Sequence, residues 1–207
     1  MPESTSSLSL SPWREMWIRP GDTVSHLVEN QPDQQVVLLA ALAGTSNSLL
    51  SAWVQSGGDE FSLGFLIVNA LAMGSIWGIG VLYVHGFLIG WTGKLLGGKG
   101  EGRDIRTALA WGALPFVAAL AVWAVAIPVF GSSLFTTASA STTGESWIFR
   151  GSSMAAAALF VYSFALTAHA LGRVQGFSAW KALLNLGLAG ILWITPFAVI
   201  SGISRLF

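Results

Sequence analysis

The chain has 207 residues, of which 53% are hydrophobic and 10% are charged, and its mean hydropathy is +0.65. A soluble domain of this size has too few polar residues to cover such an apolar composition, so the balance predicts an integral membrane protein. The formal net charge is zero, which gives no indication of a nucleic-acid partner. The absence of cysteine excludes disulfides, thiolate metal sites and cysteine nucleophiles.

Residues 1–34 are predicted to form a cytoplasmic tail with short amphipathic helices. The tail lacks the short apolar core that a cleaved signal peptide places near its start. The pair Ser11-Pro12 supplies an N-cap and a first-turn proline for one helix that ends at Pro20, and a second helix is expected over Asp22–Asn30. Both are expected to lie on the cytoplasmic leaflet with their Trp side chains toward the lipid. A tail without structure that only carries charge is the alternative.

Residues 35–207 are predicted to form an all-α membrane bundle of five transmembrane helices. Each apolar stretch is long enough for a hydrocarbon core of about 30 Å at a rise of about 1.5 Å per residue. The second stretch exceeds this length, so it must tilt, kink or extend beyond the bilayer. The five stretches are Val36–Gln55, Leu63–Trp91, Ala108–Phe130, Trp147–Leu171 and Trp180–Ile203.

Basic residues fall on alternate sides of these stretches. Short cytoplasmic loops carry the excess of Lys and Arg, so the pattern places the N-terminus in the cytoplasm and the C-terminus outside. An odd number of spans agrees with ends on opposite sides. The residues assigned to the cytoplasmic side are Arg14, Arg19, Lys94, Lys99, Arg103, Arg106, Arg173 and Lys181.

Small residues predict where the helices approach one another closely. In the second span, Gly74 and Gly78 are four residues apart, and so are Gly86 and Gly90. This small-residue spacing is typical of tightly packed membrane helices, so the second span is expected to be the central helix. Packing within one chain is the favoured interpretation, and packing between two copies is the alternative.

Two asparagines are expected to contribute to helix packing. Asn47 and Asn69 fall at a similar depth in the first and second spans, given a rise of about 1.5 Å per residue. A hydrogen bond between them would hold the two helices together. A substrate site at this depth is the other interpretation.

The loop after the second span has the spacing of a phosphate-binding loop but not its chemistry. Gly100 stands where a Ser or Thr hydroxyl is required, and a membrane helix precedes the loop where a strand is needed. Nucleotide binding is therefore excluded there, and residues 93–100 are interpreted as a glycine-rich helix stop with topogenic charge. A further role is contact with anionic lipid headgroups or a partner. The residues expected to make it are Lys94, Lys99, Arg103 and Arg106.

Serine and histidine residues do not form a catalytic or metal-binding pattern. Ser153 and His169 are on one predicted helix about 24 Å apart, whereas a nucleophile and its base must come within about 3 Å. His26, His85 and His169 have no carboxylate or thiolate beside them in the spans. No Asp or Glu lies deep in a span, where ion-coupled transporters place their relays. We therefore expect no enzymatic activity, no metal and no cofactor.

Four runs along the chain, in their order and spacing, resemble the Yip-domain family of five-span integral membrane proteins. The resemblance implies a cytoplasmic N-terminal region followed by five helices. Eukaryotic members are associated with Rab GTPase binding and traffic between organelles, but their Asp-Leu-Tyr-Gly-Pro run has no match here. That difference favours a prokaryotic-type member in the cell (inner) membrane. The runs are 17–24 (WIRPGDTV), 95–100 (LLGGKG), 106–115 (RTALAWGALP) and 174–183 (VQGFSAWKAL).

The functional hypothesis from the sequence is a non-enzymatic membrane scaffold or adaptor in membrane organisation or protein trafficking. Its expected partners are membrane lipids, other membrane proteins or further copies of itself, and no nucleic acid. The alternative is a transporter or lipid-handling protein. It is suggested by Pro115, Pro128 and Pro196, which could break the third and fifth spans around a cavity.

Overall fold

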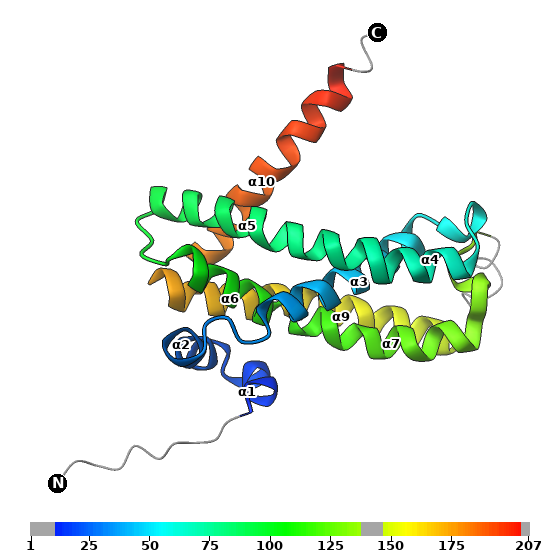
Figure 1. The fold of residues 1–207 in the computed structure, drawn as a ribbon, viewed down its shortest axis with the longest axis horizontal. Helices are drawn as coiled ribbons and strands as arrows, with labels where there is room; N and C mark the ends of the chain where they lie inside the picture. Colours follow the sequence, from blue (N-terminus) through cyan, green and yellow to red (C-terminus); the bar gives the residue numbers. More distant parts are fainter. Residues whose placement is uncertain (1–10, 138–146, 204–207) are drawn as a thin grey trace.

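The computed structural model describes the backbone of residues 11–137 and 147–203, and the side chains of residues 11–137, 151 and 154–196. Every element in these segments is a helix (Figure 1). The longer elements are α1 (Pro12–Ile18), α2 (Pro20–Asn30), α3 (Val36–Val54), α4 (Leu63–Asn69), α5 (Ser75–Leu95), α6 (Gly102–Gly112), α7 (Leu114–Phe130), α9 (Trp147–Gln175) and α10 (Ala179–Ile203). The short 3₁₀ turns η1 (Gly57–Asp59) and η3 (Gly131–Phe135) follow α3 and α7.

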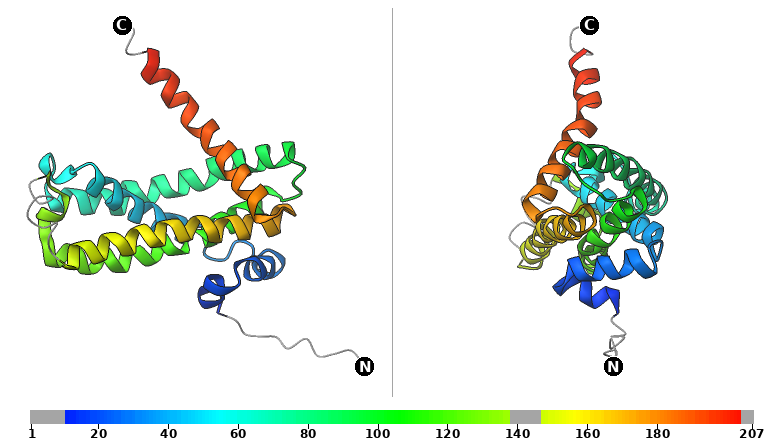
Figure 2. Two further views of the ribbon diagram at one scale, coloured as in Figure 1. Left: turned by 180° about the vertical axis from the view of Figure 1, so that it is seen from behind. Right: turned by 90° about the vertical axis from the view of Figure 1, so that its left-hand side faces the viewer.

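Four helical segments are long and apolar enough to cross a membrane. They overlap the first four spans expected from the sequence, and they run side by side in alternating directions (Figures 1 and 2). A multi-pass helix bundle is therefore confirmed, whereas a count of five spans is not. The segments are Val36–Val54, Leu63–Leu95, Gly102–Phe135 and Met154–Gln175.

The fifth expected span corresponds to α10, whose 25 residues are not among these four segments. Its side chains beyond residue 196 lie outside the described part of the chain. This helix starts beside the end of α9 and runs obliquely away from the other helices (Figures 1 and 2). It crosses α5 where the ring of Trp193 lies 5.1 Å from that of His85 and 6.2 Å from that of Trp77.

The second span is one continuous helical segment with a π-helical turn, Ala70–Gly74, between α4 and α5. It begins at Ser62, whose hydroxyl accepts a hydrogen bond from the backbone N–H of Phe65 at 3.3 Å. A π turn adds a residue to a helix without ending it. The excess length of this span is therefore taken up by a local bulge and by extension beyond the first span.

The third span starts earlier than the sequence predicted, because α6 precedes α7 with only Ala113 between them. Pro115 has no N–H to donate to the carbonyl of Trp111, so α6 ends and α7 begins with that proline in its first turn. The backbone bends at Ala113. Residues of α6 that the sequence placed in a loop, such as Ile105, are therefore buried in helix contacts.

The N-terminal helices α1 and α2 form, and part of their apolar surface packs on the bundle, whereas Ile18 of α1 is exposed. Met16, Val24 and Leu27 are buried in a cluster with Trp111 and other residues of the bundle. Helix α2 packs mainly against α9 and also against α6. The end of the bundle therefore covers these apolar side chains, and the placement of the two helices on the cytoplasmic leaflet stays a prediction.

Aromatic contacts hold α1 in the same place. The ring of Trp13 meets that of Trp111 edge to face, with 5.6 Å between centroids. The ring of Trp17 stacks on that of Tyr162 at 5.8 Å, and the Tyr162 hydroxyl donates to the Trp17 carbonyl. Such pairs add to the burial of apolar area. The tail is thus part of the folded body from residue 12 onward.

Candidate functional site at the basic end of the bundle

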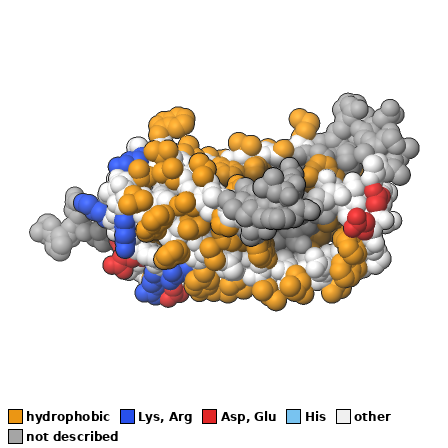
Figure 3. All heavy atoms as spheres, turned by 90° about the horizontal axis from the view of Figure 1, so that it is seen from above, with side chains coloured by type: hydrophobic (Ala, Val, Ile, Leu, Met, Phe, Trp, Pro, Cys, Tyr) orange, Lys and Arg blue, Asp and Glu red, His pale blue; other side chains and the backbone are white. Residues whose placement is uncertain are grey.

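Charged side chains are concentrated at the two ends of the molecule and separated by an apolar band (Figure 3). We call one end the basic end; it is formed by the end of α5, the loop to α6, the junction of α9 with α10, and the helices α1 and α2. The opposite end carries Asp59 and Glu60. Because buried polar side chains and most of the predicted site residues meet at the basic end, it is the candidate functional site.

Two helices stop side by side at this end, each at a glycine with positive φ. Helix α5 ends at Gly97 (φ 80°), where the N–H of Gly98 donates to the carbonyl of Gly93 at 2.7 Å. Helix α9 ends at Gly176 (φ 70°), where the N–H of Phe177 donates to the carbonyl of Gly172 at 2.7 Å. Both are Schellman motifs, in which glycine avoids the Cβ clash of the left-handed conformation. The helix stop expected over 93–100 is therefore present.

Gln175, the last residue of α9, lies between these two stops and is only 1% exposed. Its side-chain Nε2 donates to the carbonyl of Ile89 at 3.4 Å, and its Oε1 accepts from the N–H of Gly100 at 3.3 Å. Its backbone carbonyl accepts from the N–H of Lys99 at 3.2 Å. Two backbone N–H groups of the loop from α5 to α6 are therefore bonded to one glutamine.

The glycines of this loop are required by that close approach. A methyl group at Gly93 would lie 2.9 Å from Cδ of Gln175, and one at Gly98 would lie 3.0 Å from the same atom, with amide atoms of Gln175 closer still. Real Cβ contacts are not this short, so a side chain at either position would displace the amide. The glycine-rich run that has the spacing of a phosphate-binding loop thus leaves room for the side chain of Gln175.

Asn185 of α10 completes the buried polar group and is fully buried. Its Nδ2 donates to the carbonyl of Ile89 at 3.2 Å, and its Oδ1 accepts from the hydroxyl of Thr92. The Ile89 carbonyl therefore receives amides from both α9 and α10. Amides and hydroxyls do not act as acids or bases near neutral pH, so this arrangement joins α5, α9 and α10 rather than supplying a catalytic group.

Sequence reasoning missed Gln175 and Asn185 and chose Asn47 and Asn69 instead. All four are amides in or beside apolar stretches. The structure places Asn47 on the exposed surface and Asn69 half-buried, and in the described part of the chain no hydrogen bond joins them. The polar link between α3 and the second span is made instead by the hydroxyls of Thr45 and Ser75, 2.9 Å apart.

The four glycines predicted to pack do so against two different helices of the same chain. Gly74 and Gly78 face α3, where a methyl group on Gly44 would lie 2.6 Å from Cα of Gly78. A Cβ on Gly86 would lie 3.0 Å from Cγ of Arg106. Gly90 lies opposite Ile105 of α6, at 3.4 Å from its Cδ1 to a Cβ on the glycine.

The four basic residues singled out from the sequence fall into two pairs. The guanidinium of Arg103 forms an ion pair with Asp33. That of Arg106 lies 5.1 Å from the ring centroid of Tyr83. Lys94 and Lys99 are exposed, and no ion pair involves either of them in the described residues. The arginines are thus engaged within the protein, whereas the two lysines face outward.

The ion pair between Arg103 and Asp33 pins the N-terminal segment to α6. The Nε of Arg103 donates to Asp33 Oδ1 at 3.1 Å, and a second guanidinium nitrogen donates to Oδ2. Nearby, the hydroxyl of Thr107 donates to the Pro32 carbonyl, and the indole N–H of Trp111 donates to the Gln34 carbonyl at 3.2 Å. A second ion pair joins Arg173 to Asp22 at 3.0 Å and holds α2 on α9.

Arg103→Gln is expected to raise the pKa of the Asp33 carboxyl toward its ordinary value. The hydrogen bonds from Arg103 hold that pKa below its ordinary value. The ionised carboxylate therefore stabilises the contact between the N-terminal segment and α6 at pH values above the pKa of Asp33 in the unfolded chain. This stabilisation is lost as the pH falls through the lower pKa of Asp33 in the folded protein. An NMR titration of labelled Asp carboxyls in nanodiscs measures the change. The matched control is Arg173→Gln, which removes the other ion pair. An Asp33 titration unaltered by Arg103→Gln would contradict the assignment.

No group of three or more His, Asp or Glu side chains arranged to hold a metal ion occurs in the described residues. His26 and His169 are exposed, and His85 is half-buried beside Trp193. The Ser153 side chain, which the sequence analysis weighed as a nucleophile, lies outside the described residues.

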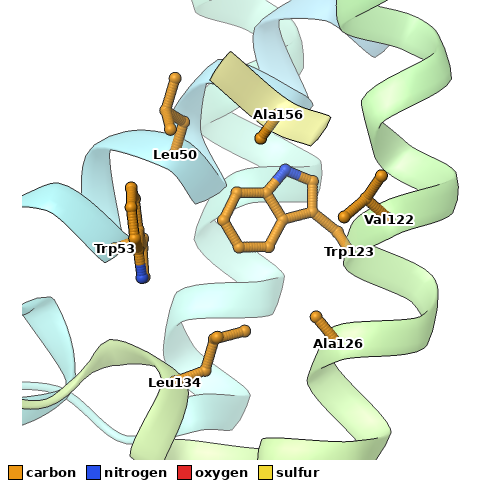
Figure 4. A pocket seen from close by; sticks show the side chains of 7 residues that line it. All are labelled: Leu50, Trp53, Val122, Trp123, Ala126, Leu134 and Ala156. Atoms are coloured by element: carbon orange, nitrogen blue, oxygen red, sulfur yellow. The ribbon is translucent and has the colours of Figure 1, made fainter. Parts of the chain in front are cut away.

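Two small cavities between α3, α7 and α9 are both lined by Trp123; Figure 4 shows the one lined by apolar side chains alone, and the other also has Ser46 in its lining. Each has a volume of about 20 Å³, close to the space of a single water molecule. Pro115 lines one of them but begins α7 rather than breaking it, and Pro128 lies near the end of α7. These cavities are too small for a transported solute or a lipid headgroup.

The comparisons with known proteins agree with this architecture. The Yip1 domain matches residues 14–200, which include α2 to α7, α9 and most of α10. Nothing similar to this chain is found among curated proteins or among solved structures. The family resemblance drawn from the four sequence runs is confirmed by this match, which covers far more than half of the chain. The chain therefore belongs to the Yip1 domain family.

Proposed function

We propose that this chain is a non-enzymatic membrane scaffold or adaptor that acts in membrane organisation or protein trafficking. The observation that most supports this role is that the buried polar side chains at the basic end form hydrogen bonds within the chain. Gln175, Asn185 and Thr92 bond to other parts of the chain, and two ion pairs fix the N-terminal helices beside them. A rigid polar end on a membrane bundle offers a fixed surface to a partner. The Yip1 family is not known as an enzyme family, which agrees with this role.

The proposed partners are membrane lipids, other membrane proteins or further copies of this chain. The test is extraction of the tagged protein with native-lipid particles, followed by cross-linking and mass spectrometry. A scaffold is expected to bring down the same proteins repeatedly, and a variant with a charge-reversed basic end, Lys99→Glu, is expected to lose some of them. Recovery of the protein alone, under conditions that preserve known complexes, would overturn the scaffold role.

We further propose a five-span topology in a prokaryotic cell (inner) membrane, with α10 as the oblique fifth span. The N-terminus is then cytoplasmic and the C-terminus external, as the basic residues indicate. Helix α10 has 25 residues, which is sufficient for a tilted crossing.

Single cysteines are expected to be labelled according to this topology, and the natural chain has none to interfere. An impermeant maleimide should label Glu60→Cys and Phe207→Cys in intact cells. Lys99→Cys and Ser11→Cys should react only after lysis. Labelling of positions 11 and 207 from the same side would contradict the five-span proposal while leaving the scaffold role open.

The transport or lipid-handling alternative is not supported by the two cavities described above. Their linings are apolar apart from Ser46 in one of them, and neither has room for a solute. The buried polar side chains Gln175, Asn185 and Thr92 line neither cavity.

A further inference from the structure

Two of the four basic residues that were expected to contact lipid, Arg103 and Arg106, contact other parts of the protein instead. A third lysine, Lys181, is exposed as Lys94 and Lys99 are. Arg103 is ion-paired with Asp33, and Arg106 is half-buried against Tyr83 and Gly86, so both hold parts of the protein together. Lys94 and Lys99 remain exposed, and Lys181 from the start of α10 is exposed too. None of these three lysines forms an ion pair within the described part of the chain. Cations without acidic partners are available to an external anion.

The folding of the two helix stops brings Lys99 and Lys181 to one corner. Phe177 lies against the loop, with its Cζ 2.8 Å from the position of a Cβ on Gly98. The Lys181 ammonium lies 4.5 Å from the centroid of the same ring. Lys99 follows Gly98 directly, and its N–H is bonded to the carbonyl of Gln175. Lys99, which follows Gly98, and Lys181 are therefore brought close to the same ring, although they come from distant parts of the sequence.

Large apolar side chains border these lysines and face outward. Leu95 is 72% exposed next to Lys94, and Trp180 is 81% exposed next to Lys181. Trp91, one turn before Leu95, is 51% exposed. Exposed Trp beside Lys at the end of apolar helices is the pattern of the headgroup layer, where the ring meets the acyl boundary and the cation meets phosphate.

We propose that the corner formed by Lys99 and Lys181, together with Lys94 from the last turn of α5, binds the headgroup of an anionic phospholipid, with Trp91, Leu95 and Trp180 against its acyl chains. The occupant is a lipid rather than a soluble anion because the cations and the exposed apolar side chains are adjacent, and only a lipid satisfies both. Glu101 is the nearest acidic residue in the loop and forms no ion pair with Lys99 in the described structure. The proposal rests on membrane insertion and does not depend on a scaffold role.

The test measures anionic lipid retained by the purified protein in native mass spectrometry. The protein is equilibrated with mixed micelles that contain phosphatidylglycerol and phosphatidylcholine in equal amounts. The wild-type chain is expected to retain phosphatidylglycerol preferentially. The double variant Lys99→Gln/Lys181→Gln is expected to lose about 25-fold in relative affinity, about fivefold for each lysine. Unchanged thermal unfolding of the variant, whose substituted side chains are exposed, would show that it remains folded.

The charge-matched control is Arg14→Gln/Arg19→Gln, which removes two exposed arginines from α1 and its C-cap. It is expected to keep the wild-type preference. An equal loss in this control would overturn the proposal, because binding would then follow only the general charge of the basic end. Displacement of lipid by millimolar inorganic phosphate would also overturn it, since the corner would then take a free anion. A loss confined to the lysine variant supports it, whether or not partner proteins are found.

Discussion

Gly78→Ala is expected to destabilise the bundle by about 1–3 kcal/mol, because overpacking of a close helix contact has a cost of this order. A Cβ at Gly78 would lie well under 3.0 Å from the carbonyl oxygen of Ala40 and 2.7 Å from Cα of Gly44. Both are backbone atoms, so no side chain can turn aside, and α3 and α5 must move apart. Equilibrium unfolding of the reconstituted protein, followed by Trp fluorescence, measures the loss.

Gly80→Ala is the matched control, two residues further along the same helix. Nothing lies within 4 Å of the position where its Cβ would be, so no loss of stability is expected. Alanine also has a better helix propensity than glycine. Equal stability of Gly78→Ala and Gly80→Ala would contradict the close approach of α3 and α5 described here.

Gln175→Ala is expected to lower the free energy of unfolding by about 1–3 kcal/mol and to loosen the loop from α5 to α6. Each hydrogen bond of the side chain contributes about 0.5–1.5 kcal/mol, and the truncation leaves the Gly100 N–H without its partner. The space between Gly93 and Gly98 would also be left empty. Faster trypsin cleavage after Lys99 reports the loosened loop, and unfolding by denaturant reports the stability.

Two further variants separate hydrogen bonding from packing at this site. Gln175→Met keeps most of the volume without the amide, so it is expected to restore packing but not the protection of Lys99. Asn47→Ala removes an exposed amide from α3 and is expected to have no effect on either readout. If trypsin cleaved Gln175→Ala no faster than the wild-type chain, the glutamine would not be what holds the loop.

Much of the fold could be predicted because local rules govern it. The apolar runs mark α3, the α4–α5 segment, α7 and α9, and Pro12 marks the start of α1. Gly97 could be assigned as a helix stop because the left-handed conformation favours glycine whatever surrounds it. The break at Ala113 lies beside Pro115, which the sequence had marked as a residue that could break the third span, although around a cavity.

The candidate site was only partly accessible from the sequence. The glycine-rich loop and its basic residues were identified, but the reason for the glycines was not, because it depends on Gln175 about 75 positions later. The contacts that Arg103 and Arg106 make within the protein could not be predicted either, because they depend on where Asp33 and Tyr83 lie. Contacts between residues distant in sequence follow from topology, and hydropathy carries no information on them.

The sequence by itself determined that this is an apolar helical membrane protein, which of its segments are helices, and that charge gathers in particular loops. The tertiary structure decided which apolar side chains are covered by protein, as Val24 and Leu27 of α2 are, and which polar side chains bond to one another. The physical reason is that the hydrophobic effect moves an apolar side chain out of water equally well into a protein interior or into lipid. Only the close approach of helices, set by Gly44, Gly78 and the glycines around Gln175, selects one arrangement from the many that share the same pattern.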